Sequence, residues 1–168
     1  MDIKLISNRY HVRKLLEKDV PDIYRLCDGN SMYYEYCPPF VTEKSIKEDM
    51  VTLPPNTTID DKHYVGFYDD NKLIAIMDLI NDYPEDHIVF IGFFMTDTII
   101  QGKGIGSNII LELCSYLKSQ NYHSVQLAWV KGNLQAEHFW LKNEFIMIKE
   151  ISSKAADSVI LAERFLQR

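Results

Sequence analysis

The spacing of apolar residues is typical of strands between residues 62 and 96. This segment contains three runs rich in β-branched, aromatic and aliphatic residues, KHYVGFYDD, KLIAIMDLI and HIVFIGFFMT. Such runs, with a turn at Asp70-Asn71 after the first, predict a meander of three antiparallel strands. The third run is apolar on both faces, so we expect it to be the central strand.

After residue 104 the apolar spacing becomes helical. Apolar residues recur every four positions, at Ile105, Ile109, Leu113 and Leu117. This period predicts a helix that ends near Asn121, a residue able to adopt the left-handed terminating conformation. The segment SVQLAWV (124–130) then predicts a buried strand, and the order strand, helix, strand predicts a right-handed βαβ unit.

Two helices are predicted before the meander. EKDVPDIYRLCDGN has Asp19 as a candidate N-cap and Gly29 as a terminator, and FVTEKSIKEDMVTL has Thr42 as a candidate N-cap. Between them, SMYYEYCPPF predicts an aromatic loop. At the other end of the chain, residues 133–143 predict a second amphipathic helix, and EFIMIKEI with SVILAERFL predicts a closing pair of strands.

Composition narrows the class of protein. A chain of 168 residues with 46% hydrophobic and 25% charged residues predicts one soluble globular domain, 1–168. The longest apolar stretch, residues 88–95, is too short to span a bilayer, and MDIKLISNRYH lacks the features of an export signal, so we expect a cytoplasmic protein without a membrane partner. A formal net charge of −6 argues against nucleic acid as a partner.

Cysteine and histidine usage gives no sign of a metal site. The three cysteines form no CxxC motif and the five histidines form no HxxxH motif. We therefore expect neither a disulfide framework nor a bound metal.

The segment IIQGKGIGSNII (100–111) places three glycines at alternate positions, between a predicted strand and a predicted helix. The first N–H groups of a helix lack partners and, together with the helix dipole, attract anions. Glycine at positions 102, 104 and 106 removes the Cβ atoms that would keep a phosphate from these amides, and Lys103 adds a positive charge. The pattern predicts a phosphate site.

Two common phosphate motifs do not fit this segment. A mononucleotide loop requires GxxxxGK followed by Ser or Thr, but here Gly104 follows Lys103 and Asp97 stands at the first glycine position. A dinucleotide fingerprint requires GxGxxG, but Ser107 stands at its last glycine, and a meander precedes it.

The segment instead resembles the signature of the GNAT superfamily of acetyl-CoA-dependent N-acyltransferases, Q/R-x-x-G-x-G/A, in residues 101–106. The resemblance continues in NLQAEHFWLKNEF, which is similar to the family's second conserved block. It implies an α/β (α+β) fold with a mixed, mostly antiparallel sheet of six to seven strands and about four flanking helices. It also implies acetyl-CoA as co-substrate.

The resemblance also implies roles for particular residues. Met95 and Thr96 stand where main-chain groups pair with the pantetheine arm, and Asn133 is similar to an asparagine that contacts that arm. Trp140 is expected to pack on the cofactor, and Lys142 lies either near its phosphates or on a solvated helix face. The full set expected to contact the cofactor is Met95, Thr96, Gln101, Gly102, Lys103, Gly104, Ile105, Gly106, Ser107, Asn133, Trp140 and Lys142.

The customary proton carriers of the family are missing. Phe90 stands near the place of the general-base glutamate, and Trp140 replaces a tyrosine that often protonates the departing thiolate. An alkylamine with a pKa of about 10.4 is neutral in only about one molecule in 2,500 at pH 7, a penalty of roughly 4.6 kcal/mol. Asp78, within the second strand of the meander, is the candidate base, and a structural role for its carboxylate remains the alternative.

Acceptor specificity is expected from the loop between the first two helices. Tyr33, Tyr34, Tyr36 and Phe40, with Tyr83, provide aromatic walls that suit a cationic or ring-bearing amine, or else pack the loop onto the sheet. The expected function is acetyl transfer to a small-molecule or peptide primary amine, by a monomer or homodimer. A non-catalytic acyl-CoA sensor and a nucleotide-binding protein are the alternatives.

Overall fold

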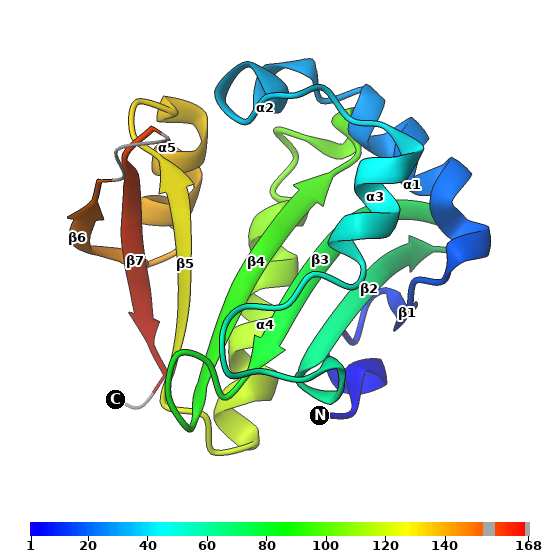
Figure 1. The fold of residues 1–168 in the computed structure, drawn as a ribbon. Helices are drawn as coiled ribbons and strands as arrows, with labels where there is room; N and C mark the ends of the chain where they lie inside the picture. The colour runs from blue at the N-terminus through cyan, green and yellow to red at the C-terminus, as the bar shows by residue number, and fades with distance from the viewer. Residues whose placement is uncertain (153–156, 167–168) are drawn as a thin grey trace.

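The computed structural model describes residues 1–152 and 157–166 and contains a seven-stranded mixed sheet with helices on both faces (Figure 1). The strands lie in the order β1-β2-β3-β4-β5-β7-β6, and each neighbouring pair is antiparallel except β4 and β5. Their bounds are β1 (His11–Lys14), β2 (Lys62–Asp69), β3 (Lys72–Asn81), β4 (Ile88–Thr96), β5 (Ser124–Val130), β6 (Ile146–Ile151) and β7 (Val159–Phe165). The predicted fold class is confirmed.

Five α-helices are present among the described residues, one more than the sequence led us to expect. They are α1 (Val20–Asp28), α2 (Ser31–Tyr36), α3 (Glu43–Asp49), α4 (Ile105–Ser119) and α5 (Leu134–Lys142). Short 3₁₀ turns, η1 (Ile3–Leu5), η2 (Glu17–Asp19), η3 (Ile59–Asp61) and η4 (Thr98–Ile100), join several of these elements.

Helix α2 corrects the aromatic loop that the sequence predicted. SMYYEY shows no apolar face with a helical period, and the helix is only one and a half turns long, so packing rather than propensity must stabilise it. The rings of Tyr33 and Tyr34 meet edge-on, Tyr33 lies edge-on to Phe93 of β4, and Tyr34 contacts Phe40. These contacts hold α2 over the sheet.

The predicted meander and βαβ unit are both confirmed. β2, β3 and β4 are consecutive antiparallel strands, with Asp70 in a left-handed conformation (φ 51°) at the first turn, and β4 is the fourth of the seven strands. β4, α4 and β5 form the parallel unit, and α4 is followed by Asn121 at φ 64°. The closing strands pair as expected, and β7 rather than β6 lies beside β5.

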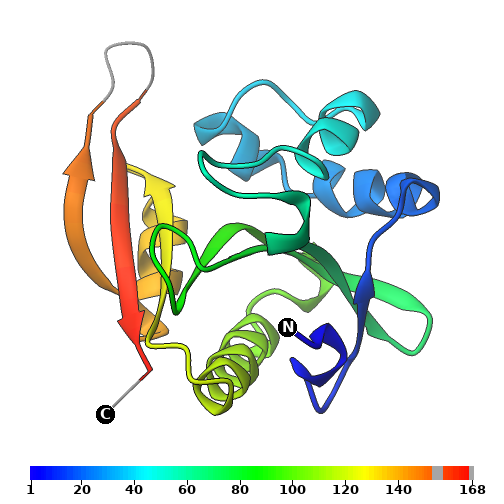
Figure 2. The same ribbon diagram turned by 60° about the horizontal axis from the view of Figure 1, so that its bottom comes forward.

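The helices divide into two groups that bury opposite faces of the sheet. α4 and α5 cover one face, where Ile109, Leu113 and Leu117 are fully buried and pack in one cluster with Trp140. α1 and α3 cover the other face through a second cluster that includes Ile23, and α2 lies beside it. Figure 2 shows α4 below the sheet, with α1 to α3 above it.

In the N-terminal half, one of the two predicted helix caps is confirmed and the other has a different role. Thr42 caps α3 as predicted, since its Oγ1 accepts the Ser45 N–H at 3.0 Å. Asp19 stands before α1 but caps η2 instead, because its carboxylate accepts the Leu16 N–H and pairs with Arg13. Strand β1 was not predicted, since its four residues are too few to show a period.

No helix among the described residues has both the length and the apolar character to cross a membrane.

Candidate active site

β4 and β5 separate part-way along their length and leave a cavity between them. Their pairing ends at Ile91 and Leu127, although β4 continues to Thr96 and β5 to Val130. Figure 1 shows the two strands diverging toward the top of the view. A cavity of about 530 Å³ lies in this opening, lined by both strands, by α2, by the start of α4 and by α5. Such an opening beside exposed strand edges is a natural ligand site.

The cavity has walls on both faces of the sheet. Phe93 faces α2, with its ring centroid 5.6 Å from that of Tyr33. Its neighbour Phe94 faces α5, where its ring lies 5.9 Å from Phe139 and 6.0 Å from Trp140. All of these residues line the cavity, so the opening connects the α2 side of the sheet with the α4 and α5 side.

A β-bulge in β4 marks the middle of the cavity wall. Asp78 pairs with Phe93 and Leu79 pairs with Ile91, so Gly92 is the extra residue of β4. A Cβ atom at Gly92 would lie 2.9 Å from the Asp78 Oδ2 atom, closer than real Cβ contacts allow. Glycine is therefore required for the carboxylate to rest against this strand, and a glycine inside a strand run is the sequence signal for such a bulge.

The turn between β4 and α4 exposes the start of the helix. Gly102 and Gly104 have φ of 75° and 79°, and no heavy atom lies within 4 Å of the position of a Cβ at either residue. The first hydrogen bond of α4 runs from the Asn108 N–H to the Gly104 carbonyl at 3.0 Å, and no side chain caps the helix. The N–H groups of residues 105–107 thus have no partner within the helix, an arrangement that together with the helix dipole favours an anion.

The third glycine of the motif has a different role from the other two. Gly106 lies within α4, and a Cβ there would be 3.3 Å from the Phe139 ring. Next to it, the Ser107 Oγ atom accepts a hydrogen bond from the Asn143 side-chain amide at 3.2 Å. The absence of a side chain at position 106 is therefore explained by the close packing of α4 on α5.

The end of β4 presents main-chain groups to the opening. The Asp97 N–H donates to the Ile74 carbonyl of β3, and alternate residues of a strand direct their main-chain groups to opposite sides. The main-chain groups of Met95 consequently face β3, while those of Phe94 and Thr96 face the opening. An extended ligand at this edge would meet the main-chain groups of Phe94 and Thr96 rather than those of Met95.

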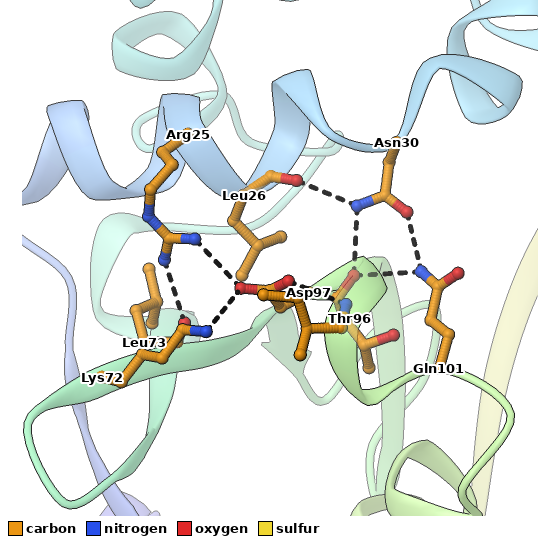
Figure 3. A network of polar contacts seen from close by, with 9 residues as sticks. Arg25, Leu26, Asn30, Lys72, Leu73, Thr96, Asp97 and Gln101 are labelled. Atoms are coloured by element: carbon orange, nitrogen blue, oxygen red, sulfur yellow. Dashed lines mark hydrogen bonds and ion pairs between the residues drawn. The ribbon is translucent and has the colours of Figure 1, made fainter.

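The side chains of Asn30, just before α2, and of Gln101, in the glycine turn, already occupy one of these main-chain groups. The Thr96 carbonyl accepts hydrogen bonds from the Asn30 Nδ2 and Gln101 Nε2 atoms, each at 3.1 Å (Figure 3). Gln101 also donates to the Asn30 Oδ1 atom at 2.8 Å, and Asn30 donates to the Leu26 carbonyl. Because Asn30 directly precedes α2, this network ties the glycine turn to the helix that forms the opposite cavity wall.

Asp97 joins the same end of β4 to α1 and to the β2–β3 turn. Its buried carboxylate accepts the Ile99 N–H and forms ion pairs with Arg25 at 3.0 Å and Lys72 at 3.5 Å (Figure 3). Burial by itself would raise the pKa of Asp97, but the hydrogen bonds from Ile99 and Arg25 and the nearby positive charges outweigh it, and its pKa is lowered.

Asp97→Asn is expected to destabilise the protein in a pH-dependent way. A hydrogen bond to a charged group contributes about 1.5–3 kcal/mol, which corresponds to a fall in Tm of roughly 3–12 °C for a chain of this size. A lowered pKa stabilises the fold above the unfolded-state value and loses this effect as pH falls through the folded-state value. Thermal unfolding should therefore show a larger difference between variant and parent at pH 7 than at pH 3. An equal difference at both pH values would contradict the assignment.

Asp78 forms a buried ion pair beside the bulge. Its Oδ2 atom lies 2.7 Å from the Lys62 Nζ atom, and the two side chains are 13% and 2% exposed. The Oδ1 atom is buried and has no hydrogen-bond partner among the described residues. Burial raises the pKa of Asp78 and exceeds the opposing effect of Lys62. A carboxylate with a raised pKa and a vacant oxygen has the properties of a proton acceptor.

The sequence and the fold were compared with those of known proteins. Residues 29–145 match the sequence pattern of the acetyltransferase (GNAT) family, which is more than two thirds of the chain. This chain belongs to the GNAT family. The GNAT family consists of acyltransferases, and the predicted resemblance is thereby confirmed.

Solved structures support the GNAT fold. An acetyltransferase from Thermus thermophilus is 15% identical, covers 93% of this chain and 96% of its own, and has a TM-score of 0.75. A chimera of the spermidine N-acetyltransferase SpeG from Vibrio cholerae and hSSAT is 17% identical over 95% of this chain and 96% of its own, with a TM-score of 0.70. A ribosomal-protein alanine N-acetyltransferase from Escherichia coli is 12% identical over 95% of each chain, with a TM-score of 0.66. No curated protein sequence matches significantly.

Most of the site residues predicted from the sequence line the one cavity. They are Tyr33, Met95, Thr96, Gln101, Gly102, Gly104, Ile105, Gly106, Ser107, Asn133, Trp140 and Lys142. Five others lie outside its lining, namely Tyr34, Tyr36, Asp78, Tyr83 and Lys103. The side chain of Lys103 is exposed, Tyr83 packs on Phe90, and Asp78 lies behind Gly92. The Oδ1 atom of Asn133 caps α5 by accepting the Ala136 N–H.

Other residues of the GNAT site had no role in the sequence-based predictions. Asn30, Cys37, Phe94 and Phe139 line the cavity, and Lys62 pairs with Asp78. A glycine within a strand run is a sequence signal for the bulge at Gly92. Neither the burial of Lys62 nor the hydrogen bonds of Asn30 has such a signal, because lysine and asparagine usually lie at the surface. The described residues contain no group of three or more His, Cys, Asp or Glu side chains that could hold a metal ion.

Proposed function

We propose that this protein transfers the acetyl group of acetyl-CoA to a primary amine, with residues 1–168 as one catalytic domain. The observation that carries the proposal is the uncapped start of α4, with unpaired N–H groups at residues 105–107 next to the cavity between β4 and β5. The family match and the fold support it, because members of the GNAT family share this reaction.

The residues of the site fit coenzyme A. The space above Gly102 and Gly104 is open, so a diphosphate can approach the N–H groups of α4 without meeting a side chain. Lys142 also lines the cavity and can contribute a positive charge. The free main-chain groups of Phe94 suit the amides of the pantetheine arm, which would extend β4 as an added strand.

The thioester supplies an activated acetyl carbon, and the residues of this chain prepare the amine. The amine nitrogen forms a bond to the carbonyl carbon, the carbon–sulfur bond breaks, and the products are an acetamide and the free thiol. The amine loses one proton overall, which the thiolate gains. Asp78 accepts that proton, directly or through water, and a main-chain N–H of β4 polarises the carbonyl.

Thiol release measured with acetyl-CoA and a panel of primary amines tests the proposal. We expect turnover with at least one amine and an acetylated product of 42 Da added mass, together with an increase in Tm on addition of CoA. CoA-induced stabilisation without turnover across the panel would favour a non-catalytic sensor. Stabilisation by ATP or NAD, and none by CoA, would favour a nucleotide-binding protein.

A further inference from the structure

The α2 side of the cavity, where an acceptor would meet the acetyl group, is uncharged. Its lining includes Tyr33, Cys37, Phe93, Ala128, Val130 and Val159. Among the described residues that line the cavity as a whole, Lys142 is the one charged side chain, and it belongs to α5 on the opposite side. No carboxylate among them faces an incoming ammonium group.

The acid nearest to this lining is already paired within the protein. Asp78 rests against Gly92, and its Oδ2 atom accepts from the Lys62 ammonium group at 2.7 Å. Lys62 is almost fully buried and also lies over the Tyr64 ring, at 5.7 Å from its centroid. The charge of the Asp78 carboxylate is therefore already balanced within the protein, and Asp78 adds no free negative charge to this side of the cavity.

Two further carboxylates, Asp49 and Asp157, interact electrostatically with residues on this side of the cavity, and neither belongs to its lining. Asp49, at the end of α3, interacts with Lys62 and Asp78, and its partial burial raises its pKa. Asp157, before β7, interacts with Cys37 and is exposed, so solvent screens its charge. Neither carboxylate lines the space that a second ammonium group would enter.

From this arrangement we infer that the acceptor is a monoamine with an apolar, preferably aromatic body and without a second positive charge. The inference rests on the proposed function. A diamine or polyamine would bury its second ammonium group among apolar and aromatic walls with no counter-charge, which is unfavourable.

A matched pair of amines tests the inference on the parent protein. Hexylamine and 1,6-diaminohexane have the same chain length and differ by one amino group. We expect kcat/KM for hexylamine to exceed that for the diamine at least tenfold at pH 8, and phenethylamine to be better than either. Equal or higher kcat/KM with the diamine would overturn the inference.

Variants of Ala128, which lines this side of the cavity, test the missing counter-charge directly. Ala128→Asp places a carboxylate in the lining, so the ratio of kcat/KM for hexylamine to that for the diamine should fall at least fivefold. Ala128→Asn adds a side chain of nearly the same size without the charge and should keep the ratio near that of the parent protein. An unchanged ratio in the aspartate variant, with CoA-induced stabilisation retained, would refute the inference.

Binding measurements distinguish failure of the inference from failure of the proposed function. Calorimetric titration of the protein saturated with CoA should show tighter binding of hexylamine than of the diamine. Preferential binding of hexylamine with no acetyl transfer to any amine would exclude the enzyme activity and leave the ligand class supported. Acetyl transfer with a preference for the diamine would support the enzyme activity and contradict the inferred ligand class.

Discussion

Gly104→Val is expected to abolish stabilisation by CoA while leaving the fold intact. Gly104 adopts φ 79° at the N-cap of α4, and a Cβ there meets no heavy atom within 4 Å. The branched side chain would fill the open space in front of the helix N–H groups, where the diphosphate is proposed to bind. The measurement is the increase in Tm caused by 1 mM CoA, which should be several degrees for the parent protein and absent for the variant.

A control is needed because valine is strained at a left-handed position, at a cost of about 1–2 kcal/mol. Gly132 provides it, since its φ is 90° and its surroundings are also open, but it lies between β5 and α5 and is absent from the cavity lining. Gly132→Val should show the same fall in Tm as Gly104→Val, roughly 2–8 °C, and keep its response to CoA. Retention of that response in the Gly104 variant would count against the proposed phosphate site.

Asp78→Asn is expected to lower kcat by about 10²–10⁴-fold, the usual contribution of a general base. Burial raises the pKa of Asp78, so activity of the parent protein should fall as pH decreases through a pKa above the ordinary aspartate value. The asparagine variant should lack this part of the pH–rate profile. A variant with undiminished kcat, or with an unchanged profile, would leave Asp78 with only a structural role.

The same substitution also removes the partner of a buried lysine. Breaking a buried ion pair from one side costs about 3–5 kcal/mol, equivalent to a fall in Tm of roughly 6–20 °C. The double variant Lys62→Met/Asp78→Asn removes both charges and should recover most of the lost stability without recovering activity. Recovery of both would show that the loss of activity came from unfolding rather than from the missing base.

Much of the fold could be predicted from the sequence because the apolar residues of its strands and helices recur with a clear spacing. β2, β3 and β4 are long apolar runs with turn residues between them, and α4 repeats an apolar residue every four positions. The glycine turn was recognisable because an unusual spacing of glycines has few structural explanations. These features depend on residues that are neighbours in sequence, which is the range over which such patterns are informative.

The remaining features depend on residues far apart in the chain. Helix α2 is stabilised by ring contacts between Tyr33 and Phe93, sixty positions apart. The hydrogen bond between Asn30 and Gln101 spans 71 positions, and nothing in either segment indicates the other. The reason for a glycine at position 106, the close approach of the Phe139 ring, lies 33 positions further along the chain. A sequence pattern can identify exposed atoms only where the residues that pack around those atoms are also close in sequence.

Because Phe93 and Phe94 direct their rings to opposite faces of the sheet, donor and acceptor would approach the reacting carbon from different sides. Neither product would then have to leave before the other. An inhibitor could block the donor side or the acceptor side of the cavity without touching the other side. A compound that joins both substrates covalently would have to extend through the gap between β4 and β5, with one half on each face of the sheet. It would gain affinity from both halves at once, far beyond that of either fragment.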